Sequence, residues 1–458
     1  MTSAIRHVAV VDIGKTNAKV ALVDLDARRE LVSRTQPNRV RRDGPYPHHD
    51  VDAIWTFVLE GLAALRRESP IDAVSVTTHG ATAALVDVRG ELVLPVLDYE
   101  SDGPDEMRDA YERVRAPFSQ TGSPALPAGL NLGAQLFWQQ RRFSDAFAEA
   151  RAILTYPQFW TMKLTGVAAS EVTSLGCHTD LWNPHARDFS TLVGEMGWRR
   201  LFPPMRRAAD MLGSLLPEIA TRTGIDPETP VACGIHDSNA SLLPHLVTRK
   251  PPFAVVSTGT WVVSMAVGGR TTPLDPARDT LVNVNAFGDP VPSARFMGGR
   301  EFERLVPDAG NATDDDWSAV LSGSVMLLPS VSSGSGPFPA RPFAWHPAEP
   351  MGHERRTAAS FYLALMTATC LDLVGAAGEI VVEGPFAGNG AYLAMLAAAT
   401  GMPVVAQRSS TGTSLGAALL LTGVCGIMPG RMVQTSGHDS ELQSYARLWS
   451  AAVQQGMP

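Results

Sequence analysis

His7-Val-Ala-Val-Val-Asp12, Ile13-Gly-Lys-Thr-Asn17 and Ala18-Lys-Val-Ala-Leu-Val-Asp24 together form the stretch that decides the fold. Two apolar runs rich in β-branched residues flank a short turn of glycine, hydroxyl and amide side chains, a pattern that predicts a β-hairpin. Farther along, a helix-like periodic segment at residues 52–65 precedes a strand-like run at residues 73–77. Strands that alternate with helices favour an α/β architecture.

The same hairpin pattern returns in the second half of the chain. Residues 253–256 and 261–267 are apolar, and the turn between them, Ser257-Thr-Gly-Thr260, again combines glycine with hydroxyl side chains. The offset is far longer than a solenoid repeat, so we favour a duplicated domain over a chance likeness of two hairpins. Prolines around residues 244–252 interrupt the apolar pattern. We therefore expect two domains, residues 1–244 and 245–458.

Length and composition limit the classes of function. With 458 residues, of which 45% are hydrophobic and 18% charged, the chain has the balance of a globular protein. The net charge of -8 and the lack of a basic stripe argue against a nucleic-acid partner. No signal peptide or membrane span is expected, and the four cysteines lack CxxC spacing. We expect a cytoplasmic protein that binds neither nucleic acid nor membranes.

The segment Val231-Ala-Cys-Gly-Ile-His-Asp-Ser-Asn-Ala-Ser241 holds the sharpest candidate site. A short strand ends in glycine, and His236, Asp237 and Ser238 follow directly before a predicted helix. Polar residues between two apolar segments are costly to bury unless they bind something. Two interpretations of Asp237 stay open: a helix N-cap, or a general base that takes a proton from a substrate hydroxyl group.

Both hairpin turns offer groups that bind phosphate, although each turn alone could equally be an ordinary hairpin. Gly14 has no Cβ, so the backbone can approach a phosphate closely. Asp12 can hold Mg²⁺, because hard cations prefer carboxylate oxygen. The P-loop pattern GxxxxGK[ST] is absent. The candidate phosphate-binding residues are Gly14, Lys15, Thr16, Asn17 and Lys19 in the first turn and Ser257, Thr258, Gly259 and Thr260 in the second.

A third glycine-rich turn, Glu383-Gly-Pro-Phe-Ala-Gly-Asn-Gly390, lies between a predicted strand and a predicted helix. Such turns often approach nucleotides, and a purely structural turn is an equal alternative. Sugar recognition needs neutral side chains that both donate and accept hydrogen bonds. The candidates for the sugar are His79, Asn131, Gln135, His236 and Asn285, and the further candidates for the nucleotide are Gly298, Gly388 and Asn389.

Five motifs in order along the chain resemble the FGGY carbohydrate kinases of the actin-like ATPase superfamily. The resemblance runs from about His7 to Gly426, nearly the full chain. The matching segments are Asp12-Ile-Gly-Lys-Thr-Asn-Ala-Lys19, Leu164-Thr-Gly166, Gly234-Ile-His-Asp237, Ser257-Thr-Gly-Thr-Trp261 and Ser414-Leu-Gly-Ala-Ala418. Thr77-Thr-His-Gly80 and Asn131-Leu-Gly-Ala-Gln-Leu136 look most similar to the fuculokinase and rhamnulokinase branch.

The resemblance implies two ribonuclease H-like domains with a cleft between them, which closes over MgATP and a sugar. The N-terminal domain would bind the sugar and the C-terminal domain the nucleotide. By resemblance, Asp237 would be the catalytic base, and Gly80, His236 and Asn285 would line the sugar, with Ser238 beside them. Asp12 would anchor Mg²⁺.

The expected reaction is ATP-dependent phosphorylation of a ketose such as L-fuculose or L-rhamnulose at a terminal hydroxyl group. The alternatives are a kinase for xylulose, ribulose, a polyol or a sugar acid, and a non-catalytic ATP-binding clamp or regulator. The oligomeric state stays open, a homodimer included.

Two departures from the family pattern bear on specificity. Pro385 and Phe386 follow Gly384 where the family has three glycines, so Phe386 would either stack on the base or narrow its pocket. Leu97-Asp-Tyr-Glu100 stands where many members have a Trp-x-Asp-x-Arg element. The identity of the sugar therefore does not transfer.

Overall fold

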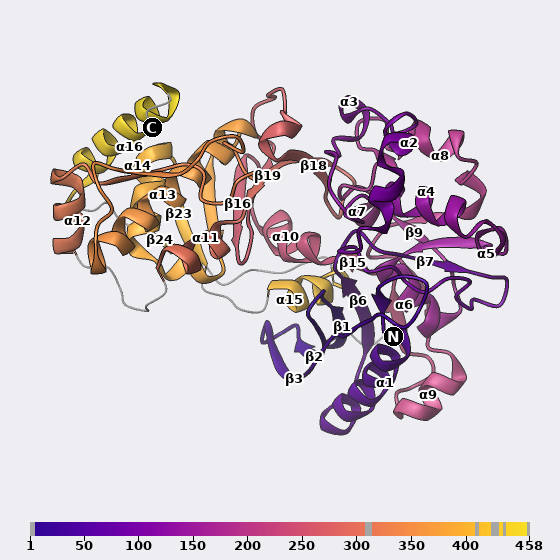
Figure 1. Cartoon of the computed structure of the whole chain (residues 1–458). Coiled ribbons are helices and arrows are strands. Elements are labelled where there is room, and N and C mark those ends of the chain that lie inside the picture. The colour runs from indigo at the N-terminus through magenta and orange to yellow at the C-terminus, as the bar shows by residue number, and fades with distance from the viewer. Residues whose placement is uncertain (1–4, 307–313, 408–411, 423–429, 434–436, 456–458) are drawn as a thin grey trace. The chain divides into compact units, whose positions relative to one another are not determined.

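The structure is a computed structural model that describes residues 5–306, 314–407, 412–422, 430–433 and 437–455. The chain forms two compact units, each built on a seven-stranded sheet (Figure 1). The expected α/β class with two sheet-containing domains is confirmed, while the domain boundary at residue 244 stays a prediction. The first unit contains Met1–Thr248, Val282–Pro290 and Thr411–Ile427, and the second contains Arg249–Leu281, Val291–Ser410 and Met428–Pro458.

The first sheet has the strand order β13–β14–β6–β1–β2–β3, with β15 also paired to β6. The predicted hairpin is confirmed, because β1 and β2 pair antiparallel with Asp12 opposite Lys19, and β1 pairs parallel with β6. The strands are β1 (His7–Ile13), β2 (Asn17–Asp24), β3 (Arg29–Pro37), β6 (Ala73–Thr78), β13 (Met211–Ser214), β14 (Pro230–Ala232) and β15 (Ile235–His236).

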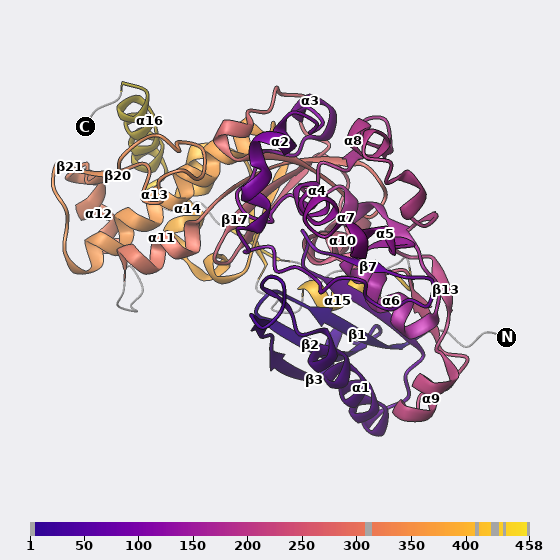
Figure 2. The same cartoon turned by 45° about the vertical axis from the view of Figure 1, so that its right-hand side comes forward.

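Alternating side chains of β1 serve two separate cores. Ala9 and Val11 pack into a cluster with α1 (Val51–Glu68) on one face of the sheet, as Figure 2 shows for α1 against β1, β2 and β3. Val8 and Val10 pack into a second cluster with α10 (Asp237–Thr248) and α15 (Gly412–Leu419). Both faces of the sheet are therefore covered, which explains why β1 reads as a continuous apolar run.

The second sheet repeats this plan. Its order is β18–β19–β17–β16–β22–β23–β24, with β16 antiparallel to β17 and parallel to β22. The repeat of the hairpin that the sequence predicts is thus confirmed at the level of topology. The strands are β16 (Phe253–Thr258), β17 (Val262–Val267), β18 (Thr280–Val284), β19 (Pro290–Phe296), β22 (Glu379–Glu383), β23 (Val404–Gln407) and β24 (Arg431–Met432).

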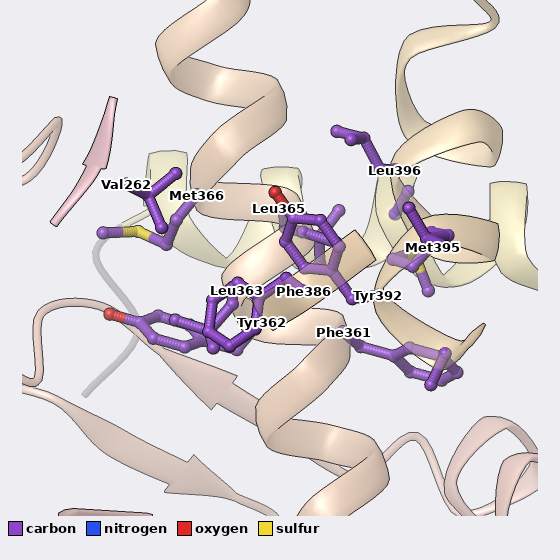
Figure 3. Packing of buried hydrophobic residues seen from close by; sticks show 14 of the residues in the cluster. Val262, Phe361, Tyr362, Leu363, Leu365, Met366, Phe386, Tyr392, Met395 and Leu396 are labelled. Atoms are coloured by element: carbon purple, nitrogen blue, oxygen red, sulfur yellow. The ribbon is translucent and has the colours of Figure 1, made fainter. Parts of the chain in front are cut away.

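The core of the second unit lies between its sheet and three helices, α13 (Gly352–Leu373), α14 (Gly390–Thr400) and α16 (Asp439–Gln455). Figure 3 shows Phe361 and Tyr362 of α13 together with Tyr392, Met395 and Leu396 of α14 in this core. Buried aromatic side chains of this size contribute strongly to the hydrophobic stabilisation of a unit.

The remaining elements are short and complete the two units. No helix in the described part of the chain is long and apolar enough to cross a membrane. The other helices are α2 (Arg108–Glu112), α3 (Phe118–Thr121), α4 (Leu132–Arg142), α5 (Ser144–Ala148), α6 (Tyr156–Thr165), α7 (Val172–Leu175), α8 (Thr191–Glu195), α9 (Pro217–Thr223), α11 (Gly298–Leu305) and α12 (Asp314–Ser322). The other strands are β4 (Val40–Arg41), β5 (His48–His49), β7 (Ala83–Val86), β8 (Ala152–Thr155), β9 (Ser170–Glu171), β10 (Trp182–Asn183), β11 (Asp188–Phe189), β12 (Met205–Arg206), β20 (Met326–Leu328) and β21 (Ala344–His346).

A close approach between α10 and α15 fixes the position of α10. A Cβ atom added to Gly416 of α15 would lie only 1.7 Å from the carbonyl oxygen of Ala240 in α10. The hydroxyl of Ser75 in β6 donates to the carbonyl oxygen of Ala417 at 2.7 Å, which ties α15 to the sheet. Gly416 therefore allows α10 to pack against a helix that is itself anchored to β6.

The substitution Gly416→Ala is expected to lower the free energy of unfolding by about 1–3 kcal/mol or more, because backbone would have to move to make room. Thermal denaturation measures the change. Gly412→Ala is the matched control in the same helix, since its Cβ would lie at an ordinary 3.6 Å from the Ser241 hydroxyl. Equal stability of the two variants would contradict the required close approach.

Candidate active site

The end of β15 places Asp237 at one edge of the first sheet. β15 runs parallel to β6 with Ile235 opposite Thr77, and β1 runs parallel to the same strand with Asp12 opposite Thr77. Parallel strands end at the same edge of a sheet, which is where ligands bind in open α/β folds. Asp237 directly follows β15 as the first residue of α10, so it emerges at the edge that Asp12 also occupies.

The carboxylate of Asp237 is held by its neighbours and is partly open to solvent. Its Oδ1 atom accepts from the Ser238 backbone N–H at 2.6 Å and lies 3.1 Å from Nε2 of His236. The side chain is 31% exposed. An N-cap carboxylate bonds to an N–H farther into the helix. Within α10 no such bond is found, so the cap interpretation has no hydrogen bond to support it.

The imidazole of His236 is buried behind the carboxylate. Its Nδ1 atom lies 3.3 Å from the side-chain nitrogen of Asn239, and its backbone N–H donates to the Thr173 hydroxyl at 3.0 Å. Burial opposes the charged form, but the neighbouring Cys177 and Asp237 outweigh it and raise the pKa of His236 to about 9. The Asn239 amide opposes protonation of the ring. Its NH₂ group can only donate, so it needs an unprotonated Nδ1 atom to accept its hydrogen bond.

Glu171 and Thr173 support His236 from inside the unit, and sequence reasoning missed both. The Thr173 hydroxyl donates to Oε2 of Glu171 at 2.5 Å, and the Thr173 backbone N–H bonds to the same carboxyl group at 3.0 Å. Burial raises the pKa of Glu171 to about 7. The Glu-x-Thr spacing is a local pattern, and nothing in the sequence connects it to a histidine 63 positions away.

Asp12 lies in a cluster of charged groups. The Nζ atom of Lys19 lies 3.8 Å from Oδ2 of Asp12 and 2.7 Å from Oε1 of Glu30. Burial raises the pKa of Asp12 to about 7; Lys19 lowers it, while the charges of Asp237 and Glu30 raise it further. One ammonium group therefore serves two carboxyl groups. Glu30, on β3, is another member that the sequence did not reveal.

The predicted sugar-binding segment lies against His236. A Cβ added to Gly80 would lie 2.8 Å from Nε2 of His236, so only glycine fits there. The neighbouring His79 ring is buried, with its centroid 5.2 Å from that of His49 and 5.4 Å from that of Tyr99. Burial lowers the pKa of His79 to about 4, so this imidazole is neutral near pH 7. The structure thus brings His79, Gly80, His236 and Asp237 together.

Three other predicted residues use their amides within the protein. The side-chain nitrogen of Asn131 donates to the carbonyl oxygens of Pro124 and His178, each at 3.0 Å, and that of Gln135 donates to the carbonyl oxygen of Ala81 at 2.6 Å. Oδ1 of Asn285 accepts from two N–H groups of its own turn. These bonds give the amides supporting roles, and direct contact with a sugar stays a prediction.

The predicted nucleotide-binding turns lie together in the second unit. The Thr258 hydroxyl donates to the Glu383 carbonyl oxygen, and a Cβ added to Gly384 would lie 2.0 Å from the Thr258 carbonyl oxygen. A Cβ added to Gly299, next to Gly298 at the start of α11, would lie 1.9 Å from the Gly259 carbonyl oxygen. Two glycine-containing segments, at Gly384 and at Gly298–Gly299, therefore pack backbone against backbone around Ser257–Thr260.

The departure at Pro385-Phe386 has a structural explanation. The Phe386 ring is 6% exposed and packs against Phe302 and Tyr392, at centroid distances of 5.5 and 5.2 Å (Figure 3). It belongs to the hydrophobic core, so it neither stacks on a bound base nor narrows a pocket. Gly388 is exposed, whereas Asn389 caps α14 by accepting from the Tyr392 N–H at 3.0 Å.

The charge on Asp12 predicts a pH-dependent stability. The folded pKa of about 7 exceeds the ordinary aspartate pKa of 3.8, so folded protein keeps a proton that unfolded protein releases between these values. Stability therefore falls as the pH rises from about 4 to 7. Asp12→Asn removes this titration and should be more stable than the wild type by roughly 2–4 kcal/mol at pH 8, but by less than about 1 kcal/mol at pH 4.

Thermal unfolding at both pH values, without Mg²⁺, measures this difference. Asp26→Asn is the control, because Asp26 is 74% exposed and pairs with Arg6 near the other end of the same hairpin. A gain for Asp12→Asn that is equal at both pH values would contradict the assigned cause.

Comparison with known proteins agrees with this arrangement. Residues 7–244 match the model of the FGGY family of carbohydrate kinases, N-terminal domain, and residues 250–429 match the model of carbohydrate kinase FGGY, C-terminal domain. An L-fuculokinase from Salmonella typhi is 26% identical over 273 residues, 57% of each protein. The matched stretch thus spans a little over half the length of this curated relative.

Solved structures extend the likeness to the whole chain. A carbohydrate kinase from Novosphingobium aromaticivorans is 37% identical with a TM-score of 0.90, and the match covers 99% of both chains. A gluconate kinase from Lactobacillus acidophilus, 14% identical, matches with a TM-score of 0.80 over 99% of both chains and shows likeness of fold alone. The resemblance seen in the sequence is confirmed: this chain belongs to the FGGY family of carbohydrate kinases.

Proposed function

We propose that this protein transfers the γ-phosphoryl group of ATP to a terminal hydroxyl group of a small sugar, with Asp237 as the general base. The observation that carries the proposal is the placement of Asp237. Its carboxylate is partly exposed at the ligand-binding edge of the first sheet, beside Asp12 and in contact with His236. Phosphoryl transfer requires such a base next to the acceptor hydroxyl.

The two oxygens of the Asp237 carboxylate would have different tasks. Oδ1 is occupied by Ser238 and His236, which fixes the plane of the carboxylate. Oδ2 would then accept the proton of the sugar hydroxyl as that oxygen attacks the γ-phosphorus. A base held in one orientation loses little entropy when the substrate binds.

The nucleotide would be bound by the second unit. Thr258 and the glycines around it bring several backbone groups to one place, where N–H groups can donate to phosphate oxygens. On the first unit, Gly14, Thr16 and Asn17 line the exposed or half-exposed turn that follows Asp12. These residues are proposed as the remaining phosphate donors.

A Mg²⁺ ion fits the residues around Asp12. In the described part of the chain, no group of three or more His, Cys, Asp or Glu side chains is arranged to hold a metal ion by itself. However, burial raises the pKa of Asp12 to about 7 and the charges of Asp237 and Glu30 raise it further, so a cation there would be favoured. Asp12 would hold an ion that arrives with the nucleotide, directly or through water. When bound, Mg²⁺ would neutralise charge on the phosphate oxygens.

The acceptor is proposed to be a ketose. Relatives carry the names L-fuculokinase, rhamnulokinase and xylulose kinase. The first two names agree with the branch that Thr77-Thr-His-Gly80 resembles, so L-fuculose and L-rhamnulose are the first acceptors to test. A coupled ADP-release assay with these sugars, xylulose, ribulose and polyols identifies the acceptor.

The variant Asp237→Asn is expected to lose kcat for the sugar by about 10²–10⁴-fold, because an amide cannot take up the hydroxyl proton. Binding of MgADP, measured by calorimetry, should stay within about twofold of the wild type, since the proposed phosphate donors are untouched. Asp26→Asn serves as the control for loss of one negative charge. Turnover near the wild-type rate in Asp237→Asn would remove this residue from the role of base.

Asn239 would keep His236 suited to its role. When the Asn239 amide donates to Nδ1, the ring proton lies on Nε2, which is 3.1 Å from Oδ1 of Asp237. Asn239 would thereby hold the ring neutral against the charges of Cys177 and Asp237, which favour the imidazolium. A neutral donor stabilises the orientation of the carboxylate, whereas an imidazolium would also lower its basicity.

Asn239→Asp should therefore lower kcat by about tenfold or more, because a carboxylate facing Nδ1 favours the imidazolium. The KM for ATP should change little. Asn183→Asp in β10 is the control, since Asn183 uses only its Oδ1 atom in its turn and a carboxylate can replace it. An unchanged kcat, and an unchanged pH profile of kcat, would show that the protonation of His236 does not matter.

A further inference from the structure

The ammonium group of Lys15 is held away from solvent by three neighbours. It hydrogen-bonds to Oδ1 of Asp98, lies 3.5 Å from Oε2 of Glu100, and sits 4.7 Å from the centroid of the Tyr99 ring. Asp98 is nearly buried, and its Oδ1 also accepts from the Glu100 N–H at 3.2 Å. These four residues, Lys15 and Asp98 to Glu100, are called the Lys15 clamp below.

The Lys15 clamp lies on the side of the site where the acceptor is proposed to bind. Tyr99 contacts the ring of His79 at a centroid distance of 5.4 Å. The charges of both Lys15 and Asp237 act on His79, and the charge of Asp237 also acts on Tyr99. Lys15 was predicted as a phosphate donor from its place in the turn, and that role stays a prediction. In this structure its side chain extends toward the sugar-binding segment instead.

The charges of this part of the first unit are predominantly negative. Lys15 is matched by two carboxylates, Asp98 and Glu100. Lys19, the other ammonium group here, is matched by Asp12 and Glu30. Asp237 adds one more carboxylate next to His236. A carboxylate on the acceptor would therefore meet cations that already have anionic partners.

We propose that the Lys15 clamp selects uncharged polyhydroxyl acceptors and excludes sugar acids. This inference rests on the proposed function, because it concerns the acceptor that Asp237 would deprotonate. An ammonium group has three donors: one bonds to Asp98, and Glu100, with Oε2 at 3.5 Å, can take a second. The third can donate to a hydroxyl oxygen, which brings no charge, whereas a second anion would be repelled by Asp98, Glu100 and Asp237.

The test compares kcat/KM for L-fuculose, L-rhamnulose, xylulose and ribulose with kcat/KM for gluconate at low ionic strength. The wild type should prefer the best neutral sugar over gluconate by at least about 30-fold, the product of about tenfold for the buried Asp98 and about threefold for the exposed Glu100. Asp98→Asn should reduce this preference about tenfold, and the exposed Glu100→Gln about threefold. Lys15→Met in the Asp98→Asn background should restore the preference for neutral sugars.

The control is Asp26→Asn, which removes one negative charge from the first unit outside the site and should leave the preference unchanged. Use of gluconate as readily as a neutral sugar by the wild type would overturn the proposal. So would a proportional change for both kinds of acceptor in Asp98→Asn and Glu100→Gln.

Failure of the proposed function would look different. If no sugar on the panel is phosphorylated, the kinase assignment fails. Calorimetric binding of the same sugars and of gluconate then still tests whether the Lys15 clamp prefers uncharged acceptors. The same ratios are then expected between dissociation constants. Because Asp98 is buried and its substitution could unfold the protein, Glu100→Gln provides the decisive result in that case.

Discussion

The parallel pairing of β1, β6 and β15 is the constraint on which the proposed chemistry depends. Three strands from distant parts of the sequence end at one edge, with Asp12 and Ile235 both opposite Thr77 of β6. A shift of one residue would turn every side chain of a strand to the other face of the sheet. Burial on both faces, by α1 on one and by α10 and α15 on the other, makes such a shift costly. The carboxylates of Asp12 and Asp237 are held at the same edge by the cores on each side of the sheet.

That placement creates an electrostatic cost that a ligand can relieve. Asp12 is desolvated and near two other carboxyl groups, so its pKa rises to about 7 although Lys19 is close. Glu171 is buried with only hydroxyl and N–H donors and reaches a similar pKa. Such strained charges occur where a protein prepares a site for a cation or a proton transfer, although structural networks produce them too. Asp12 lies at the ligand-binding edge, whereas Glu171 bonds to Thr173 behind His236, so we assign them different tasks.

Local patterns predicted the parts of the fold that depend on local chemistry. The two hairpins, helix α1 and the change from strand to helix at His236-Asp237 all follow from apolar runs and turn residues that are near one another in sequence. Contacts across long separations were not predictable in this way. Glu30 reaches Lys19 from β3, and Cys177 reaches His236 from the end of α7, without any pattern in their own segments. Phe386 could not be placed from its own segment either. Only its packing against Tyr392 shows that this ring, beside a glycine turn, faces the core.

The duplicated hairpin shows how one scaffold can serve two kinds of chemistry. In the first unit, the end of β1 and the beginning of β2 carry a charged pair, Asp12 opposite Lys19, on either side of a glycine turn. At the corresponding point of the second unit, Ser257 lies opposite Val263, so topology is repeated and the ion pair is not. Proton transfer and cation binding need ionisable groups, whereas phosphate binding by N–H and hydroxyl donors does not. The difference between two otherwise similar turns is therefore the physical reason to assign the acceptor and the metal to the first unit and the nucleotide to the second.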